Sequence, residues 1–325
     1  MYISAPAAQR LQFWSPSKQN HSMKTITSIL VPTDFSDVAL SAFTYALQLA
    51  DALDASIDLM HAIPPTTDNP GYDIFINHLT TDLQEEARHC LSKFFARGIG
   101  QVNQQLSRVP QVENHVMVGD LRLCIRQHIE DHGNQLIVMG TAGRRNAWDD
   151  FLGTNASYLV NRAPCPVLVI PPGATYREIK SICFATDLHD VGTFQAGKLL
   201  RALRPFQPDL HFLHVRQAGQ QEAAEYDLDL LREVFDRPEA GLKASFNDLP
   251  AEDLVEAVFS FAQEKECELV VMHRPDRTWL RRLLLKSNTS EAVRRARLPL
   301  LIITAEDLVA TDQPAQGQPV RELNP

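Results

Sequence analysis

The sequence predicts an α/β protein of two tandem domains, each with a doubly wound, parallel, five-stranded sheet. Its 325 residues exceed the needs of one ordinary α/β domain and fit two domains of about 150 residues each. Short apolar runs rich in Val, Ile and Leu alternate with longer segments of helical period. This alternation is typical of βαβ units around a parallel sheet.

An internal repeat supports the division into two domains. The run Ile29–Asp34 (ILVPTD) returns as Ile182–Asp187 (ICFATD), a shift of 153 residues. Further along, Leu136–Met139 matches Leu269–Met272 at a shift of 133 residues. Each half is therefore one copy of the same unit, and the second copy has lost about 20 residues in its middle.

The expected elements follow the repeat. Strands are predicted in both copies near 26–33, 56–62, 112–118, 135–139, 166–170, 179–186, 208–215, 242–246, 268–272 and 299–303. Helices are predicted at 38–53 and 120–132, and the segment 76–107 has room for a helix plus a loop.

These elements define two domains and two flanking segments. The first domain is expected over 25–172 and the second over 178–304. The short breaker Pro171-Pro172-Gly173 joins them. A flexible arm is expected over 1–24 and a disordered tail over 305–325.

Composition excludes several classes of protein. The net charge of −9 argues against specific nucleic-acid binding, which favours a basic domain. No apolar run is long enough to span a membrane, and residues 1–22 lack the apolar region of a secretory signal. Five scattered cysteines without a C-x-x-C pair favour a reducing compartment. We therefore expect a cytoplasmic protein.

One motif carries recognisable chemistry. After the fourth strand the chain reads Gly140, Gly143, Gly153 and Thr154 in the pattern G-x2-G-x9-G-[ST], followed by Asn155 and a helical segment. Glycines allow backbone N–H groups to approach a phosphate, and a helix N-terminus favours an anion. Asp34, after the first strand, is placed to accept hydrogen bonds from ribose hydroxyls. An N-cap role is an equally good interpretation of Asp34.

With this motif, residues 25–304 resemble the universal stress protein family, whose fold is of the adenine nucleotide alpha hydrolase type. Thr33-Asp34 and the ending Ala163–Ile170 (APCPVLVI) share the likeness. The resemblance implies bound ATP or another adenine nucleotide in the first domain, with Pro32, Thr33, Ala62 and Met139 lining its adenine and ribose side. It also implies that the last strands of the two domains pair, Val167–Ile170 against Leu300–Ile303, as an internal pseudo-dimer. Association of two chains as a homodimer stays open.

Two departures from the motif keep other functions open. Asp149 and Asp150 in the nine-residue loop repel a triphosphate unless they point away or a divalent cation such as Mg²⁺ bridges them. In the second copy His273, Asp276 and Lys286 replace the three glycines, so no nucleotide is expected there. Its arginine-rich stretch 274–297 is a solvated face or a dock for an anionic ligand or partner.

Three functions therefore remain: a nucleotide-binding stress-response regulator, a nucleotide-free scaffold, and a slow ATPase. No P-loop, Ser/His/Asp arrangement or metal cluster appears at useful spacing, so neither catalytic residues nor metal ligands are predicted. His61 and His214 end corresponding strands, and both are expected to be packed, hydrogen-bonded residues rather than ligands.

Overall fold

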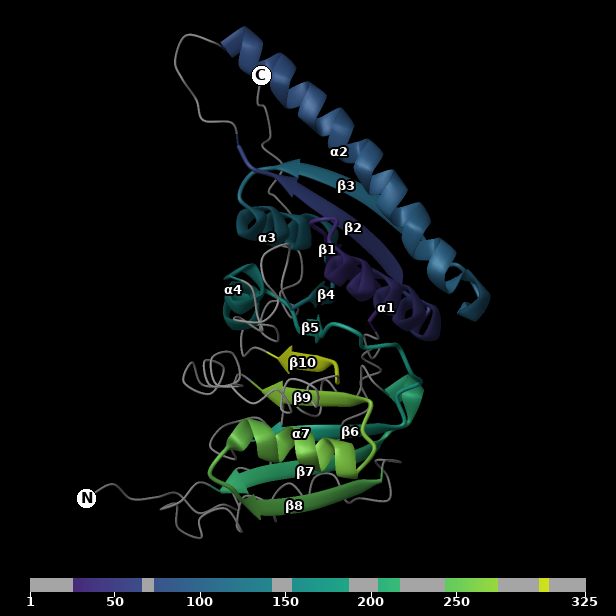
Figure 1. Cartoon of the computed structure of the whole chain (residues 1–325), viewed down its shortest axis with the longest axis vertical. Coiled ribbons are helices and arrows are strands. Elements are labelled where there is room, and N and C mark those ends of the chain that lie inside the picture. The colour runs from purple at the N-terminus through teal and green to yellow at the C-terminus, as the bar shows by residue number, and fades with distance from the viewer. Residues whose placement is uncertain are drawn as a thin grey trace, which may run out of the picture.

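The computed structural model describes residues 26–65, 73–141, 154–186, 204–216, 243–273 and 298–303. Within these residues ten strands form one continuous sheet in the order β3-β2-β1-β4-β5-β10-β9-β6-β7-β8. Figure 1 shows this sheet running through the whole molecule, with the first half of the chain at one end and the second half at the other.

The first half contributes five parallel strands. They are β1 (Ser28–Pro32), β2 (Ser56–Ile63), β3 (Val112–Val118), β4 (Leu136–Gly140) and β5 (Val167–Ile170). The central strand β1 has four of its five residues buried, and β4 and β5 are similarly enclosed. Strands covered on both faces read as continuous apolar runs, which explains why these three were visible in the sequence.

Helices cover both faces of this half-sheet. The helices α1 (Asp37–Leu53) and α2 (Asp73–Val102) pack together on one face, and α3 (Leu121–His132) and α4 (Thr154–Arg162) pack together on the other (Figure 1). Successive residues of β2 therefore point to opposite faces of the sheet. Leu59 belongs to the core under α1, and Met60 belongs to the core under α3. The doubly wound arrangement is confirmed.

The second half repeats the order. Its strands are β6 (Ser181–Thr186), β7 (Asp209–Arg216), β8 (Ala244–Pro250), β9 (Leu269–His273) and β10 (Leu300–Ile303), again mutually parallel. The helix α7 (Leu254–Glu264) packs on β6, β7 and β9. All ten predicted strands are therefore present, although β8 continues four residues beyond the predicted end at 246.

The two halves join through their last strands. Strand β5 pairs with β10 in the only antiparallel contact among the described strands, with Val169 opposite Leu300 and Val167 opposite Ile302. All eight residues of these two strands are buried. The predicted internal pseudo-dimer is confirmed, because one chain supplies both partners of the seam.

The cysteines form no disulfides, and the described helices lack the properties of membrane spans. All five cysteines are free thiols, and all except Cys90 are buried. Burial raises the pKa of the Cys267 thiol to about 11 despite a hydrogen bond with Ser181, so this thiol stays protonated at neutral pH. None of the helices in the described ranges combines the length and apolar character that a membrane-spanning segment needs.

Candidate functional site

The candidate site lies where the strand order reverses. From β1 the chain moves outward to β2 and β3, and it then returns to β4 on the other side of β1. The helices that follow β1 and β4, namely α1 and α4, lie on opposite faces of the sheet (Figure 1). In open α/β sheets ligands bind beyond the carboxyl ends of the strands at such a reversal. Pro32 ends β1 at this edge and Gly140 ends β4.

The loop after β1 is held by its own backbone and side chains. The N–H of Thr33 donates to the carbonyl oxygen of Met60 over 2.8 Å, and the Thr33 hydroxyl accepts from the N–H of Phe35 over 3.0 Å. Phe35 has a φ of 64°, a left-handed backbone that is rare for a bulky residue and that persists only when its surroundings enforce it. Thr33 is therefore a buried, fixed point just beyond the carboxyl end of β1.

Asp34 does not cap the first helix. Ser36 is the N-cap of α1, and its hydroxyl oxygen accepts from the N–H of Ala39 over 3.1 Å. One carboxylate oxygen of Asp34 accepts from the N–H of Ser36 over 3.0 Å, which closes a local turn. The N-cap interpretation of Asp34 was therefore wrong, and its exposed carboxylate lies just beyond the carboxyl end of β1.

His61 is a packed residue. Its Nδ1 lies 2.8 Å from the carbonyl oxygen of Thr33 and must donate, since a carbonyl oxygen can only accept. Its ring lies 4.3 Å from that of Phe35, which in turn contacts Phe94 of α2 edge-on. In the matching His214, Nδ1 forms a hydrogen bond of 3.1 Å with a carboxylate oxygen of Asp248. The prediction of packed, hydrogen-bonded histidines is confirmed for both.

The end of β4 requires a glycine. A Cβ atom on Gly140 would lie 2.6 Å from Val38 Cγ1 and 3.0 Å from the carbonyl oxygen of Val38, at the start of α1. Strand β4 and helix α1 therefore approach each other as closely as a bare backbone permits. Met139 and Thr141 on either side of this contact are buried.

Only some of the other predicted site residues lie within the described part of the structure. Ala62 is half-buried near the end of β2 and packs beside the core. Thr154 begins α4, and Asn155 is exposed in its first turn. The remaining motif glycines and the acidic pair of the loop lie outside the described residues, namely Gly143, Gly153, Asp149 and Asp150.

The second half has a side chain where the first has Gly140. His273 ends β9 and lies opposite Ile303 of β10, just as Gly140 ends β4 opposite Ile170 of β5. The predicted correspondence of these two positions is confirmed by the strand register. Asp276, Lys286 and the whole arginine-rich stretch 274–297 lie outside the described residues.

A comparison with protein families shows to which family the chain is related. The model of the universal stress protein family matches the chain twice, over residues 25–171 and 178–304. The chain belongs to the universal stress protein family. As a tandem member it carries two domains of the family in one chain, in agreement with the repeat in its sequence and with its two joined half-sheets.

Individual universal stress proteins align with one domain or with both. Universal stress protein Slr1230 of Synechocystis is 23% identical over 294 residues, which span 84% of this chain and 98% of that protein. Universal stress protein MJ0531 of Methanocaldococcus jannaschii is 30% identical over 147 residues, which span 44% of this chain and 80% of that protein.

A solved universal stress protein supports the fold. The crystal structure of a universal stress protein from Archaeoglobus fulgidus covers 86% of this chain and 99% of its own, with a TM-score of 0.62 at 17% identity. At this identity the likeness concerns the fold alone.

The structure also gathers polar residues that the sequence analysis did not single out. His115, His128 and His132 lie together on the α3 face of the sheet, beside the buried Asp58 of β2. Burial opposes ionisation of Asp58, but hydrogen bonds from His128 and Asn134 and the proximity of His115 lower its pKa to about 2. The spacing of His128 and His132, four residues apart on a predicted helix, was the signal available in the sequence.

Proposed function

We propose that the first domain binds one adenine nucleotide, ATP together with Mg²⁺, in the crevice beyond β1 and β4. The observation that carries the proposal is the contact at Gly140. Strand β4 meets α1 there with no room for a side chain, and the spacing G-x2-G-x9-G-T follows directly. Gly140, which the packing against α1 requires, is the first residue of the glycine motif that is suited to binding phosphates.

The surroundings suit each part of the ligand. Asp34 is exposed beside the crevice and offers a carboxylate to the ribose hydroxyls. Pro32, Thr33, Ala62 and Met139 stand at or next to the carboxyl ends of β1, β2 and β4, where they line the adenine and ribose side. Gly143, Gly153, Thr154 and Asn155 supply backbone N–H groups and polar side chains to the phosphates.

We assign the second domain a regulatory or interaction role without nucleotide. His273 replaces the glycine that the first domain places against α1, and Asp276 and Lys286 replace the other two glycines. An acid in a phosphate cradle repels the ligand. The pairing of β5 with β10 places the two domains in direct contact.

The test is the nucleotide that the protein retains. We expect freshly purified protein, denatured and filtered, to release adenine nucleotide at close to one equivalent per chain, measured by anion-exchange chromatography. Gly153→Val, which adds a branched side chain to the cradle, should release little. The matched control Gly100→Val adds the same side chain at an exposed helical position with open space around it and should release as much as the wild type.

The second candidate function is a nucleotide-free scaffold that binds an anionic partner through the stretch 274–297. The acidic pair Asp149 and Asp150 favours it, because both carboxylates lie inside the phosphate-binding motif. The absence of released nucleotide, together with binding lost on charge reversal of Arg281 and Arg282, would support it over the first proposal. Slow ATP hydrolysis is the third function, and it would require steady phosphate release that is lost in Gly153→Val.

A further inference from the structure

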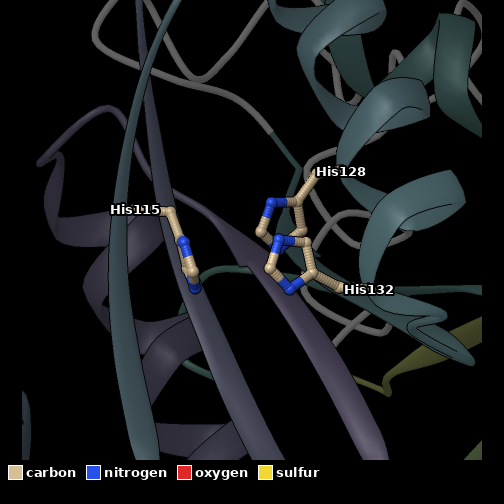
Figure 2. A group of neighbouring side chains, drawn as sticks. All are labelled: His115, His128 and His132. Atoms are coloured by element: carbon tan, nitrogen blue, oxygen red, sulfur yellow. The ribbon is translucent and has the colours of Figure 1, made fainter.

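Three imidazole rings converge on the α3 face of the first half-sheet. His115 projects from β3, and His128 and His132 project from α3 toward it (Figure 2). The rings of His128 and His132 are stacked with centroids 4.1 Å apart, and His115 meets them edge-on at 4.6 and 5.2 Å. One ligand nitrogen of each ring lies within 4.8 Å of the other two.

The elements explain why these rings meet. His128 and His132 are four residues apart on α3 and therefore lie on the same face of the helix. His115 lies opposite Met60 of β2 in the parallel register, and Met60 belongs to the core beneath α3. Helix and strand thus present their histidines to the same space from opposite sides.

One ring nitrogen of the cluster has no hydrogen bond. Nε2 of His115 is buried without a hydrogen bond, although it lies 3.4 Å from a carboxylate oxygen of Asp58. A buried ring nitrogen without a hydrogen bond is unusual in folded proteins. A ring nitrogen in this state, next to two other imidazoles, is available as a metal ligand.

Asp58 supplies the outer support of such a site. Its second carboxylate oxygen lies 3.1 Å from Nε2 of His128 and accepts from the side-chain amide of Asn134 over 2.7 Å. Metal-binding histidines almost always have their other ring nitrogen held by a carboxylate or carbonyl, which sets the tautomer and the ring orientation. Asp58 does this for His128 from the neighbouring strand.

We propose that His115, His128 and His132 bind a divalent zinc ion, with a water molecule or a nearby carboxylate in the fourth position. Three neutral imidazoles are a ligand set that zinc accepts in tetrahedral geometry. Bonds of about 2.1 Å place the ligand atoms of such a site about 3.4 Å apart. The ligand atoms now lie within 4.8 Å of one another, and the rings of His128 and His132 are stacked nearly parallel. Binding one ion therefore requires a ring to turn, for which the exposed His132 has room.

The zinc site is separate from the proposed nucleotide site. Helix α3 begins after the carboxyl end of β3 and runs back toward the start of β4, so His128 and His132, in its last turns, lie toward the amino ends of the strands. The proposed nucleotide site beyond Pro32 and Gly140 lies at the carboxyl ends. Failure of either proposal therefore leaves the other standing.

The experiment is zinc titration of the full chain after removal of metal with a chelator. Isothermal titration calorimetry with zinc chloride should give one strong site per wild-type chain. Co²⁺ in place of zinc should show the visible absorption of a tetrahedral ion. His132→Gln removes an exposed ligand and should weaken zinc binding at least about tenfold, a loss that perturbing even an outer-shell partner can produce. His115→Gln should do the same.

Matched controls distinguish zinc binding at this site from nonspecific binding. His89→Gln changes an exposed histidine of α2 outside the cluster and should bind zinc as the wild type does. Circular dichroism spectra of all variants establish that each is folded. The proposal is overturned if the wild type binds no zinc, or if His132→Gln and His115→Gln, both folded, bind it as tightly as His89→Gln.

Discussion

Replacement of Ile302 by aspartate is expected to destabilise the protein by about 3–5 kcal/mol, the cost of an uncompensated buried charge. Ile302 is 0% exposed and lies opposite Val167 in the β5–β10 seam, so an added carboxylate would be enclosed in the apolar core that Ile302 occupies. Urea denaturation followed by circular dichroism measures the loss as a lower transition midpoint.

Leu123→Asp is the matched control for this variant. Leu123 is a large apolar residue of α3 that is 68% exposed, so the same change of charge there should alter stability by no more than about 0.5 kcal/mol. If Ile302→Asp were as stable as Leu123→Asp, the seam would not be a buried junction, and the description of one continuous sheet would be wrong.

Gly98→Ala is expected to destabilise the first domain by about 1–2 kcal/mol, although alanine is the better helix former. A Cβ on Gly98 of α2 would lie 2.4 and 2.5 Å from ring atoms of Phe43. Phe43 is a fully buried residue of α1, so its ring has no free space to enter. The same ring stacks on Phe94, which contacts Phe35 in the loop beside the proposed nucleotide site.

Gly100→Ala gives the opposite sign on the same helix. No atom lies within 4 Å of a Cβ at Gly100, so only the helix propensity acts, and the variant should gain about 0.5–1 kcal/mol. Thermal unfolding of the two variants beside the wild type makes the comparison. Two shifts of equal sign would mean that α1 and α2 do not approach as closely as Gly98 indicates.

The fold could be predicted because its signal is repeated and local. Buried parallel strands such as β1 and β4 read as continuous apolar runs, and the second copy confirmed the first. Strand β8 was the least well bounded, since its residues are half-buried or exposed and include Asn247 and Asp248. Its pairing with β7, a tertiary effect, extends it past the apolar residues.

The candidate site could be predicted less completely. Spacing alone identified the Gly140 motif, and the contact with Val38 gives it a physical reason. The N-cap residue of α1 could not be predicted from the sequence, because Asp34 and Ser36 are both good N-cap residues. Only the geometry of the loop distinguishes them.

The histidine cluster shows the limit of reading by spacing. His128 and His132 are adjacent on one helix, but the third member comes from β3, and its approach depends on how α3 crosses the sheet. The role of Asp58 could not be predicted from the sequence either. A single acid inside an apolar strand does not indicate its partners, and His128 and Asn134 come close to it only in the folded chain.

The most direct measurement is isothermal titration calorimetry of ATP with magnesium on nucleotide-free protein. The account predicts one site per chain in the wild type and none in Gly143→Asp, which copies the second domain's residue into the first. Gly100→Asp, the same substitution at an exposed position with open space around it, should bind as the wild type does. No binding by the wild type, or two equivalents per chain, would contradict a single nucleotide site in the first domain.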